Sequence, residues 1–427
     1  MNTQTMERPN HKVIFFIIFT TFLNMVGLTL IIPLAPFLVA RYVGDSNNIG
    51  LTVGWLTSAY AICQFIAAPG LGAFSDRFGR RPIMLLCLLG SAGGYLLLGI
   101  GGSLWVLFLG RIIDGLTGAN GAILNAYIAD IVPPTERGKY FGWLGAVGAI
   151  SVILGPTVGG FMAKLGYQLP FFAASGVLFI NLLLGFFFMP ESLPKEKRTA
   201  SINLVRLNPI STVKDILTMP QLRWLLVAIF LTTLSFIAIS ANISLFAKDS
   251  LNWDTTTVGT LFSVFGVSSL VAQAVVLPWL IKHLGTLKVT IVGLIFAIIS
   301  FLLMSLVAVV ASPLLMYIAF ILLAIGEGLI SPSLLDLITR ATDARSQGKV
   351  LGGNQSLQSL ANMAGPLYVG GVYDNVGHAA PYLSGAGMLL LSLGALILAL
   401  PALKRSEADK ATDSVITAPV VALQNDV

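Results

Sequence analysis

Three ionisable residues interrupt long apolar stretches of this sequence: Arg111, Asp114 and Glu327. Arg111 and Asp114 are three positions apart, so an α-helix would place both side chains on one face. A charge at membrane depth costs free energy unless it is paired or faces a wet cavity, and this pair can neutralise itself. Protonation of Asp114 would free Arg111 to find another partner, which is how a proton-coupling site behaves. A fixed ion pair that only stabilises the structure fits the residues equally well.

Glu327 lies in the stretch 326–332, between two glycines and before Pro332, with no basic residue within one helical turn. The glycines and the proline favour a loosened helix beside a cavity. An unpaired carboxyl group there can take up a proton from one side and release it to the other, or it can bind a cationic substrate. We favour such a role in proton coupling. The structural alternative is a protonated side chain that is hydrogen-bonded to another helix.

Uncharged polar side chains within other apolar stretches could line a cavity, although each of them could also bridge two helices. Gln355, Gln358 and Asn362 recur at steps of three and four, so they would share a helix face and are the better candidates. The predicted substrate-cavity residues are Asn24, Gln64, Asn125, Asn242, Gln273, Gln355, Gln358 and Asn362, and Asn181 is a further polar residue of this kind.

The composition indicates that the lipid bilayer is the solvent for these side chains. The chain of 427 residues is 56% hydrophobic and 10% charged, whereas soluble domains carry about 25% charged residues. The sequence contains no nucleophile–base constellation, so it does not predict an enzyme. It contains no phosphate-binding loop either, so it does not predict ATP-driven pumping. The isolated His and Cys residues predict no metal site. The net charge of +6 is attributed to loops beside membrane spans and not to nucleic-acid binding.

Apolar stretches long enough to cross a membrane recur along the chain and predict an all-α polytopic protein with twelve transmembrane helices. Most Lys and Arg residues then fall in loops on one side, which predicts that both termini are cytoplasmic. The first stretch is too long for a signal-peptide core, so we expect it to be retained. The predicted spans are 13–40, 50–73, 82–101, 104–128, 140–163, 168–189, 222–247, 256–281, 287–310, 313–338, 350–371 and 380–402.

The two halves of the chain repeat each other. The Gly-Pro pair at 155–156 returns at 365–366, at the same offset that relates Gly138 to Gly348. Such a repeat predicts two six-helix bundles, as in duplicated transporters. The predicted organisation is a cytoplasmic N-terminus at 1–12, a bundle at 13–189, a cytoplasmic linker at 190–221, a second bundle at 222–403, and a polar, disordered cytoplasmic tail at 404–427.

A charged stretch at 72–82 separates the second and third predicted spans and reads GAFSDRFGRRP. It cannot lie in lipid, so we predict a cytoplasmic loop. The pattern resembles the signature loop between helices two and three of the major facilitator superfamily, with Phe74 in place of the usual Leu. In that family the aspartate and basic residues hold the two halves together on the cytoplasmic side when the outside is open. The matching residues, to which the resemblance assigns conformational gating, are Gly72, Asp76, Arg77, Gly79, Arg80 and Arg81.

Further motifs extend the resemblance. Arg111 and Asp114 match the fourth-helix motif of the superfamily, whose arginine is thought to take part in proton transfer. The stretch 155–160, GPTVGG, matches the motif that marks antiporters, and its glycines would let helices approach closely. Residues near the ends of the fourth span and the start of the fifth are expected to latch loops. The gating residues in these motifs are Asp130, Arg137, Gly155, Pro156, Gly159 and Gly160.

The whole chain resembles the drug:proton antiporters of this superfamily, nearest to the tetracycline-resistance-like multidrug efflux branch. The resemblance implies a protein of the bacterial inner membrane that exports small amphipathic compounds by alternating access, and we expect it to be a monomer. The proton gradient would be its energy source, without a cofactor. The alternatives are a proton-coupled importer or exporter of metabolites on the same fold, and a non-transporting membrane sensor. Asn24 stands where many relatives carry an acid, and the third span contains no acid, which weakens the tetracycline assignment.

Overall fold

The computed structural model describes residues 11–43, 48–118, 120–133, 136–199, 209–342 and 346–424, and within these ranges it contains helices and no β-strand. Eleven helical stretches there are long and apolar enough to cross a membrane. The helix Gln347–Val376, with 30 residues, is also long enough, but its glycine, asparagine and glutamine residues make it more polar than the others. The prediction of an all-α polytopic fold is confirmed.

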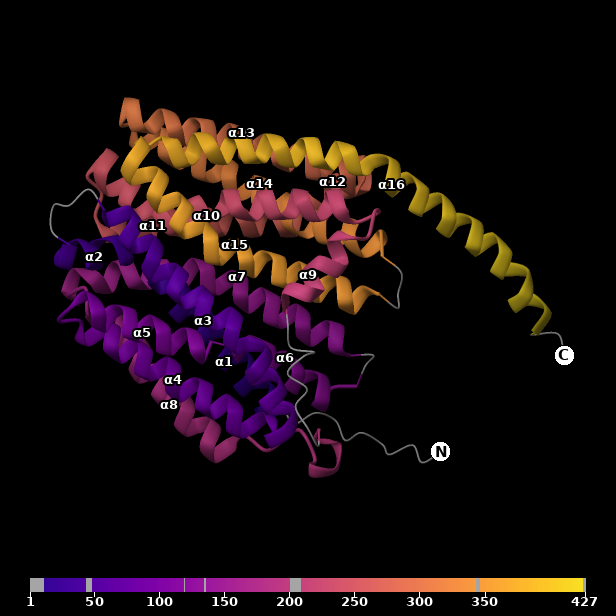
Figure 1. The fold of residues 1–427 in the computed structure, drawn as a ribbon, viewed down its shortest axis with the longest axis horizontal. Helices are drawn as coiled ribbons and strands as arrows, with labels where there is room; N and C mark the ends of the chain where they lie inside the picture. The colour runs from indigo at the N-terminus through magenta and orange to yellow at the C-terminus, as the bar shows by residue number, and fades with distance from the viewer. Residues whose placement is uncertain are drawn as a thin grey trace.

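The first half of the chain forms the helices coloured from indigo to magenta in Figure 1. Two predicted spans are interrupted: a turn at 31–34 that contains Pro33 ends one helix, and residues 117–118 end another. Proline cannot donate the backbone hydrogen bond that would continue the helix. The helices are α1 (His11–Leu30), α2 (Ala35–Val43), α3 (Ile49–Phe78), α4 (Arg80–Ile100), α5 (Leu104–Leu116), α6 (Asn120–Ile131), α7 (Arg137–Met162) and α8 (Leu169–Phe188).

The second half begins after the segment 200–208, which lies outside the described residues. Its helices are α9 (Pro209–Leu217), α10 (Arg223–Leu251), α11 (Thr255–Val271), α12 (Leu277–Leu284), α13 (Thr286–Val310), α14 (Pro313–Arg340), α15 (Gln347–Val376) and α16 (Ala380–Gln424). A π-helical turn, Ala272–Val276, joins α11 to α12. The backbone of α16 continues as a helix to Gln424, where a disordered tail was predicted.

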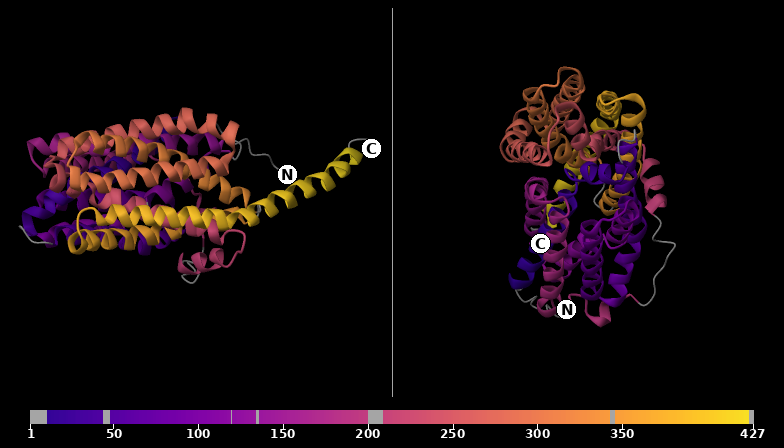
Figure 2. Two further views of the ribbon diagram at one scale, coloured as in Figure 1. Left: turned by 90° about the horizontal axis from the view of Figure 1, so that it is seen from above. Right: turned by 90° about the vertical axis from the view of Figure 1, so that its left-hand side faces the viewer.

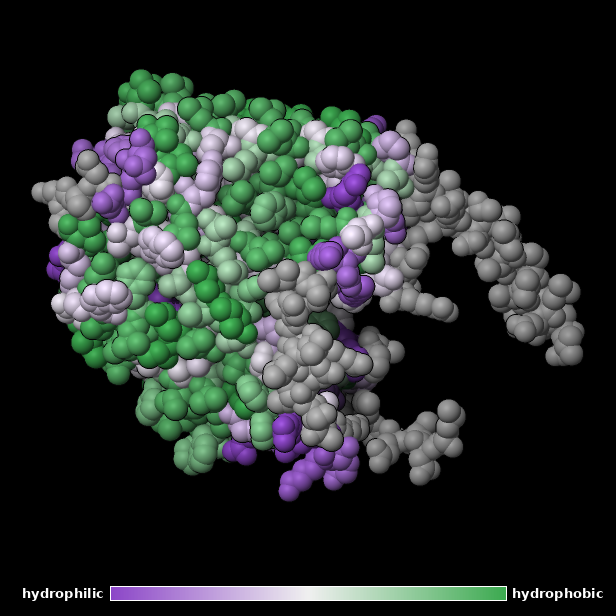
Figure 3. Space-filling model, in the orientation of Figure 1, coloured by the Kyte–Doolittle hydropathy of each residue, from purple (hydrophilic) through white to green (hydrophobic). Residues whose placement is uncertain are grey.

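Each half of the chain builds its own hydrophobic core. One core contains buried residues from Val13 to Met189, and the other contains buried residues from Val213 to Leu403. The two groups of helices form separate layers in Figure 1, and the right-hand view of Figure 2 shows the same separation. Hydrophobic residues cover the middle of the face in Figure 3, whereas hydrophilic residues gather toward its margins. This distribution is typical of a protein surrounded by lipid.

The charged stretch 72–82 is almost entirely helical, whereas the sequence predicted a loop. α3 continues to Phe78 and α4 begins at Arg80, so Gly79 alone lies outside the two helices. Gly79 has a φ of +108°, a conformation that glycine adopts without strain. The apolar pattern ends earlier than the helix because the last turns can extend into the polar interface, where charged side chains are solvated.

The two ends of the molecule differ. We call the end that carries Asp76, Arg80 and Arg137 the basic end; α1 begins and α16 ends on this side (Figure 1). The two halves of the chain meet at the opposite end, which we call the sealed end, where α3 packs against α15 and α7 packs against α11. There the hydroxyl of Ser244 in α10 donates a hydrogen bond of 3.0 Å to the carbonyl oxygen of Ile32.

The glycines of α7 explain how closely the helices approach at the sealed end. A Cβ atom on Gly160 would collide with the carbonyl oxygen of Thr255 in α11, and one on Gly159 would collide with the carbonyl oxygen of Leu30. By contrast, a Cβ on Gly148, nearer the basic end, would have no neighbouring atom within 4 Å. The close backbone contacts along α7 are therefore concentrated near the sealed end.

We predict opposite effects on stability for Gly160→Ala and Gly148→Ala. The added methyl group at 160 meets a backbone atom that can move only if two helices separate, so the loss should be about 1–3 kcal/mol. At 148 the methyl group enters open space and replaces glycine inside a helix, which should stabilise by about 0.5–1 kcal/mol. Thermal unfolding of the purified protein in detergent measures both. Equal shifts for the two variants would contradict the described contact.

Candidate functional site

Two adjoining cavities lie among the helices. One has a volume of ≈ 230 Å³ and is lined by residues of both halves, including Arg111; the other has a volume of ≈ 390 Å³ and is lined by residues of α10, α14 and α15, including Glu327. We call them the Arg111 cavity and the Glu327 cavity. Ile237, Ser240 and Asn362 line both of them. The Arg111 cavity is mainly apolar, with a few polar groups, as is usual for small-molecule sites.

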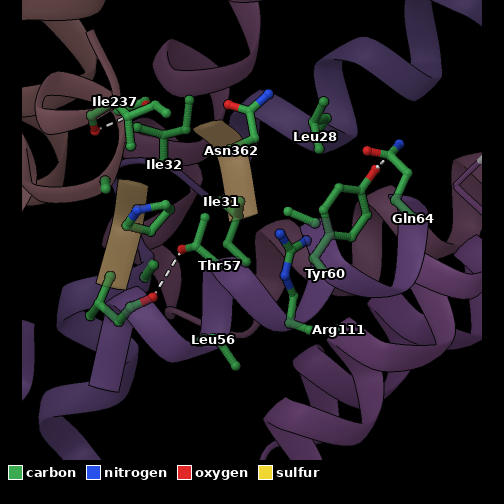
Figure 4. Close-up of a pocket in the computed structure, with 16 residues that line it drawn as sticks. Leu28, Ile31, Ile32, Leu56, Thr57, Tyr60, Gln64, Arg111, Ile237 and Asn362 are labelled. Carbon is green, nitrogen blue, oxygen red and sulfur yellow. Dashed lines mark hydrogen bonds between the residues drawn. The ribbon is translucent and has the colours of Figure 1, made fainter. Parts of the chain in front are cut away.

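Arg111 and Asp114 lie on α5 and have only 2% and 4% of their surfaces exposed. Nη1 of Arg111 donates a hydrogen bond of 3.3 Å to Oδ2 of Asp114, as their spacing predicted. The guanidinium group also lies 4.2 Å from the centre of the Tyr60 ring, and Figure 4 shows it extending toward that ring. Its Nε atom has no hydrogen-bond partner among the described residues. The pair is thus neutral overall, and the arginine retains a buried donor that no described residue satisfies.

Thr57, Tyr60 and Gln64 form a polar stripe on α3 that lines the Arg111 cavity. Nε2 of Gln64 donates to the Tyr60 hydroxyl at 3.0 Å and to the carbonyl oxygen of Gly118 at 2.8 Å. Gln64 was predicted from the sequence, but Thr57 and Tyr60 were not. A signal was present, because steps of three and four residues place all three side chains on one helix face.

Glu327 lies on α14 and lines the other cavity. The hydroxyl of Ser269 in α11 donates a hydrogen bond of 3.3 Å to Oε2 of Glu327, and Nε2 of Gln273 donates to that hydroxyl at 3.1 Å. The salt bridges formed by the described residues do not include Glu327. The carboxyl group therefore faces a cavity, and no cationic side chain of the described residues neutralises it.

One face of α15 supplies Asn354, Gln358 and Asn362 to the Glu327 cavity. Asn354 is only 6% exposed, and its Oδ1 has no hydrogen-bond partner among the described residues. Asn354 was not predicted from the sequence, whereas Gln355 was, and Gln355 is exposed on another face of the helix. Positions four residues apart nearly align along a helix, so the side chains of α15 that line the cavity recur every four residues.

Several predicted cavity residues lie outside both cavities and make other contacts. Oδ1 of Asn24 accepts a hydrogen bond of 3.2 Å from Asn120, and Nδ2 of Asn181 donates to Thr20 at 3.1 Å. These side chains bridge helices, which was the alternative role for such residues. The predicted residues that do not line either cavity are Asn24, Asn125, Asn242, Gln273 and Gln355.

The acidic gating residues contact partners within the first half of the chain. Asp76 forms a salt bridge of 2.5 Å with Arg80, and Arg80 forms one of 3.2 Å with Asp130. The hydroxyl of Ser192 also donates to Asp130 at 3.0 Å. Asp130 therefore connects α6 to α4 and to the segment after α8. Gly72 lies within α3, and a Cβ there would meet no atom within 4 Å.

The basic gating residues also have local partners. Arg81 donates a hydrogen bond to the carbonyl oxygen of Phe186, and Arg137 donates one of 2.6 Å to the carbonyl oxygen of Ala129. The Arg77 guanidinium lies against the ring of the next residue in the chain. These described contacts join helices of one bundle. The family role of holding the two halves together applies when the opposite side is open, and here that side is sealed.

Comparison with known proteins identifies the family. The sequence profile of the Major Facilitator Superfamily matches residues 17–366 and 251–424. This chain belongs to the major facilitator superfamily. Tetracycline resistance protein, class C, of Escherichia coli is 34% identical over 410 residues, which cover 95% of this chain and 100% of that protein. Multidrug resistance protein 2 of Bacillus subtilis (strain 168) is 28% identical, with 90% of this chain and 94% of that protein covered.

Solved structures of other transporters have the same fold. The human organic anion transporter MFSD10 matches with a TM-score of 0.67 and 24% identity, covering 90% of this chain and 99% of that chain. A bacterial homologue of the human lysosomal transporter Spinster, in an inward-facing and unoccupied conformation, matches with a TM-score of 0.68 and 13% identity, covering 93% and 96%. The major facilitator fold and the resemblance to the tetracycline-resistance branch are confirmed. This superfamily member is a multi-pass protein of the bacterial inner membrane.

We predict that Asp114→Asn strongly destabilises this major facilitator protein. The substitution leaves the Arg111 guanidinium buried without its counter-charge, which costs about 3–5 kcal/mol. The paired change Arg111→Met with Asp114→Asn removes both charges and should recover most of the loss. Thermal unfolding of the purified variants measures the effect. If the single variant is as stable as the native protein, the ion pair does not support the fold.

Proposed function

We propose that this protein exports small amphipathic, drug-like compounds across the bacterial inner membrane in exchange for protons. Relatives named for tetracycline and multidrug resistance support export, as does Quinolone resistance protein NorA of Staphylococcus aureus (strain MSSA476), which is 26% identical with 85% of this chain covered. The observation that carries the coupling is the position of Glu327, a carboxyl group that faces a cavity and has no salt bridge within the described residues.

The sealed end corresponds to the outside of the cell in this proposal. Basic residues favour the cytoplasmic side of a membrane, so the basic end faces the cytoplasm, with both termini. The structure then represents the state that loads substrate from the cytoplasm. Opening to the outside requires the contacts of α3 with α15 and of α7 with α11 to break. Asp76, Arg77 and Arg81 would then contact the other half at the basic end, as the family resemblance implies.

In this proposal, the proton and the substrate compete for the same few buried charged side chains. In the outward-open state, a proton from outside binds Glu327 and neutralises it. In the state described here, the ionised carboxylate can instead attract a cationic or hydrogen-bond-donating group of the substrate, next to Asn354. Protonation of Asp114 in the same cycle would free Arg111 for another partner. Because a single site alternates between proton and substrate, their movements are coupled in opposite directions.

The pathway needs only one chain in this proposal. Both cavities are built from helices of the same protein, and the residues that would bind protons lie beside them. We therefore expect a monomer to transport, with the proton gradient as its energy source and no cofactor. Transport by purified protein in vesicles, with an imposed pH gradient as the only energy source, tests this point.

Substrate identity is testable by growth and by direct transport. A drug-sensitised strain that expresses the protein should survive higher concentrations of some amphipathic compounds than the same strain without it. In inside-out vesicles, those compounds should accumulate when the interior is acidified, because export in the cell corresponds to uptake there. No protection across a broad panel, together with metabolite uptake by whole cells, would contradict drug export.

We predict that Glu327→Gln abolishes proton-dependent efflux while expression is retained. Glutamine has nearly the same shape and can accept the hydrogen bond from Ser269, but it cannot exchange a proton at physiological pH. The matched control is Asp336→Asn on the same helix: Asp336 lies at the basic end, where it accepts a hydrogen bond of 2.8 Å from Thr286 and pairs with Arg340. Normal proton-dependent efflux by Glu327→Gln would remove this residue from the mechanism.

A further inference from the structure

At the sealed end, the carboxylate of Asp374 crosses the boundary between the two halves. Asp374 lies near the end of α15, and its Oδ1 accepts a hydrogen bond of 3.0 Å from the backbone N–H of Gly50. Its Oδ2 accepts one of 2.7 Å from the backbone N–H of Leu51. Both donors belong to the first turn of α3. A side chain of the second half therefore caps a helix of the first.

The first turn of α3 needs such a cap. The initial N–H groups of a helix have no acceptor within the helix, and they carry a partial positive charge that favours an anion. The residue in the N-cap position, Asn48, makes no side-chain hydrogen bond to this turn. Two N–H groups are instead satisfied by Asp374. The helix terminus is a positive partner for this carboxylate, which forms no salt bridge among the described residues.

Backbone packing makes this contact depend on closure of the sealed end. A Cβ on Gly370, one turn earlier in α15, would collide with the carbonyl oxygen of Gly50. A Cβ on Gly54 would collide with the carbonyl oxygen of Pro366. The aspartate side chain is short, so it can reach the N–H groups only while the two backbones touch. Separation of α3 from α15 would break both hydrogen bonds at once.

The surroundings of Asp374 contain few other charges. Asp249 of α10 accepts a hydrogen bond of 2.7 Å from the Tyr373 hydroxyl, and the Tyr373 ring stacks on His378 with ring centres 4.6 Å apart. The first turn of α3 contributes no titratable side chain. The nearby carboxylate of Asp249 disfavours the charge on Asp374, whereas His378 and the N–H groups of Gly50 and Leu51 favour it.

We propose that Asp374 is the latch of the sealed end: its carboxylate holds α3 against α15 and must release the helix each time this end opens. It is a positioning residue for transport and does not itself bind substrate. The proposal rests on the alternating access of the proposed function, but it is independent of the substrate and of proton coupling. Its test therefore uses no transported compound.

The test measures how often the sealed end opens. Ser240 lines both cavities, so the single reporter Ser240→Cys becomes accessible to a membrane-impermeant maleimide from outside the cell only when the sealed end opens. Added to this reporter, Asp374→Asn should increase the labelling rate about fivefold, because the amide keeps one acceptor oxygen but loses the second acceptor and the charge that the helix terminus favours. Protein that retains native Ser240 gives the background from Cys63 and Cys87.

Asp374→Glu separates a latch from a packing role. Asparagine has nearly the shape of aspartate but no charge, whereas glutamate keeps the charge and both oxygens but is larger. A latch predicts that labelling increases from the native protein to Asp374→Glu and is fastest in Asp374→Asn. If Asp374 only fills space, Asp374→Glu should be the more disruptive change. That order would overturn the proposal, as would native labelling by Asp374→Asn.

The matched control is Asp254→Asn, which removes a carboxylate charge at the same end but keeps an acceptor oxygen that can cap its own helix, and the boundary between α3 and α15 is not touched. Asp254 accepts a hydrogen bond of 2.8 Å from the N–H of Thr257 and so caps its own helix, α11. Its labelling from outside should stay at the native rate. In inside-out vesicles, all variants should label as the native protein does, which shows that they are folded. Equal acceleration by Asp254→Asn would mean general loosening and would contradict a specific latch.

Discussion

A polar group without a partner in apolar surroundings carries a free-energy penalty of roughly several kcal/mol, and this constraint shapes the whole molecule. Arg111 is neutralised by Asp114 and covered by the Tyr60 ring. At the sealed end, Asp374 satisfies two N–H groups of another helix. Glu327 differs, because it faces a cavity and accepts a hydrogen bond from a hydroxyl group. Binding of a proton or a cation to a carboxyl group without a counter-charge can change the relative free energies of the conformational states.

The same constraint connects the two ends of the molecule. At the sealed end, glycines allow backbones to touch, and polar contacts such as that from Ser244 to Ile32 cross between the halves. At the basic end, Asp76 and Arg80 satisfy each other within one bundle. A rocking motion can therefore exchange one set of satisfied contacts for another without leaving charges exposed to lipid. Alternating access needs two states of similar free energy, and such an exchange can provide them.

Residue-level features were predictable where they depend on local spacing. The ion pair of Arg111 with Asp114 follows from their positions on one helix, and the helical spans follow from length and apolar character. The cavity lining was predicted only in part. Gln355 was chosen and Asn354 was missed, although they are neighbours, because the face of α15 that meets the cavity depends on how α15 packs against α10 and α14.

The sequence by itself determined the class of protein: a membrane-embedded bundle of about twelve helices, duplicated in two halves, with a few charges in unusual places. Apolar length, glycine motifs and charge bias are local properties, so they can be recognised without coordinates. Only the tertiary structure decided which end is sealed, which polar face lines a cavity, and that Asp374 caps Gly50 more than three hundred positions earlier in the chain. These contacts depend on the relative placement of whole helices, which spacing along the chain does not encode.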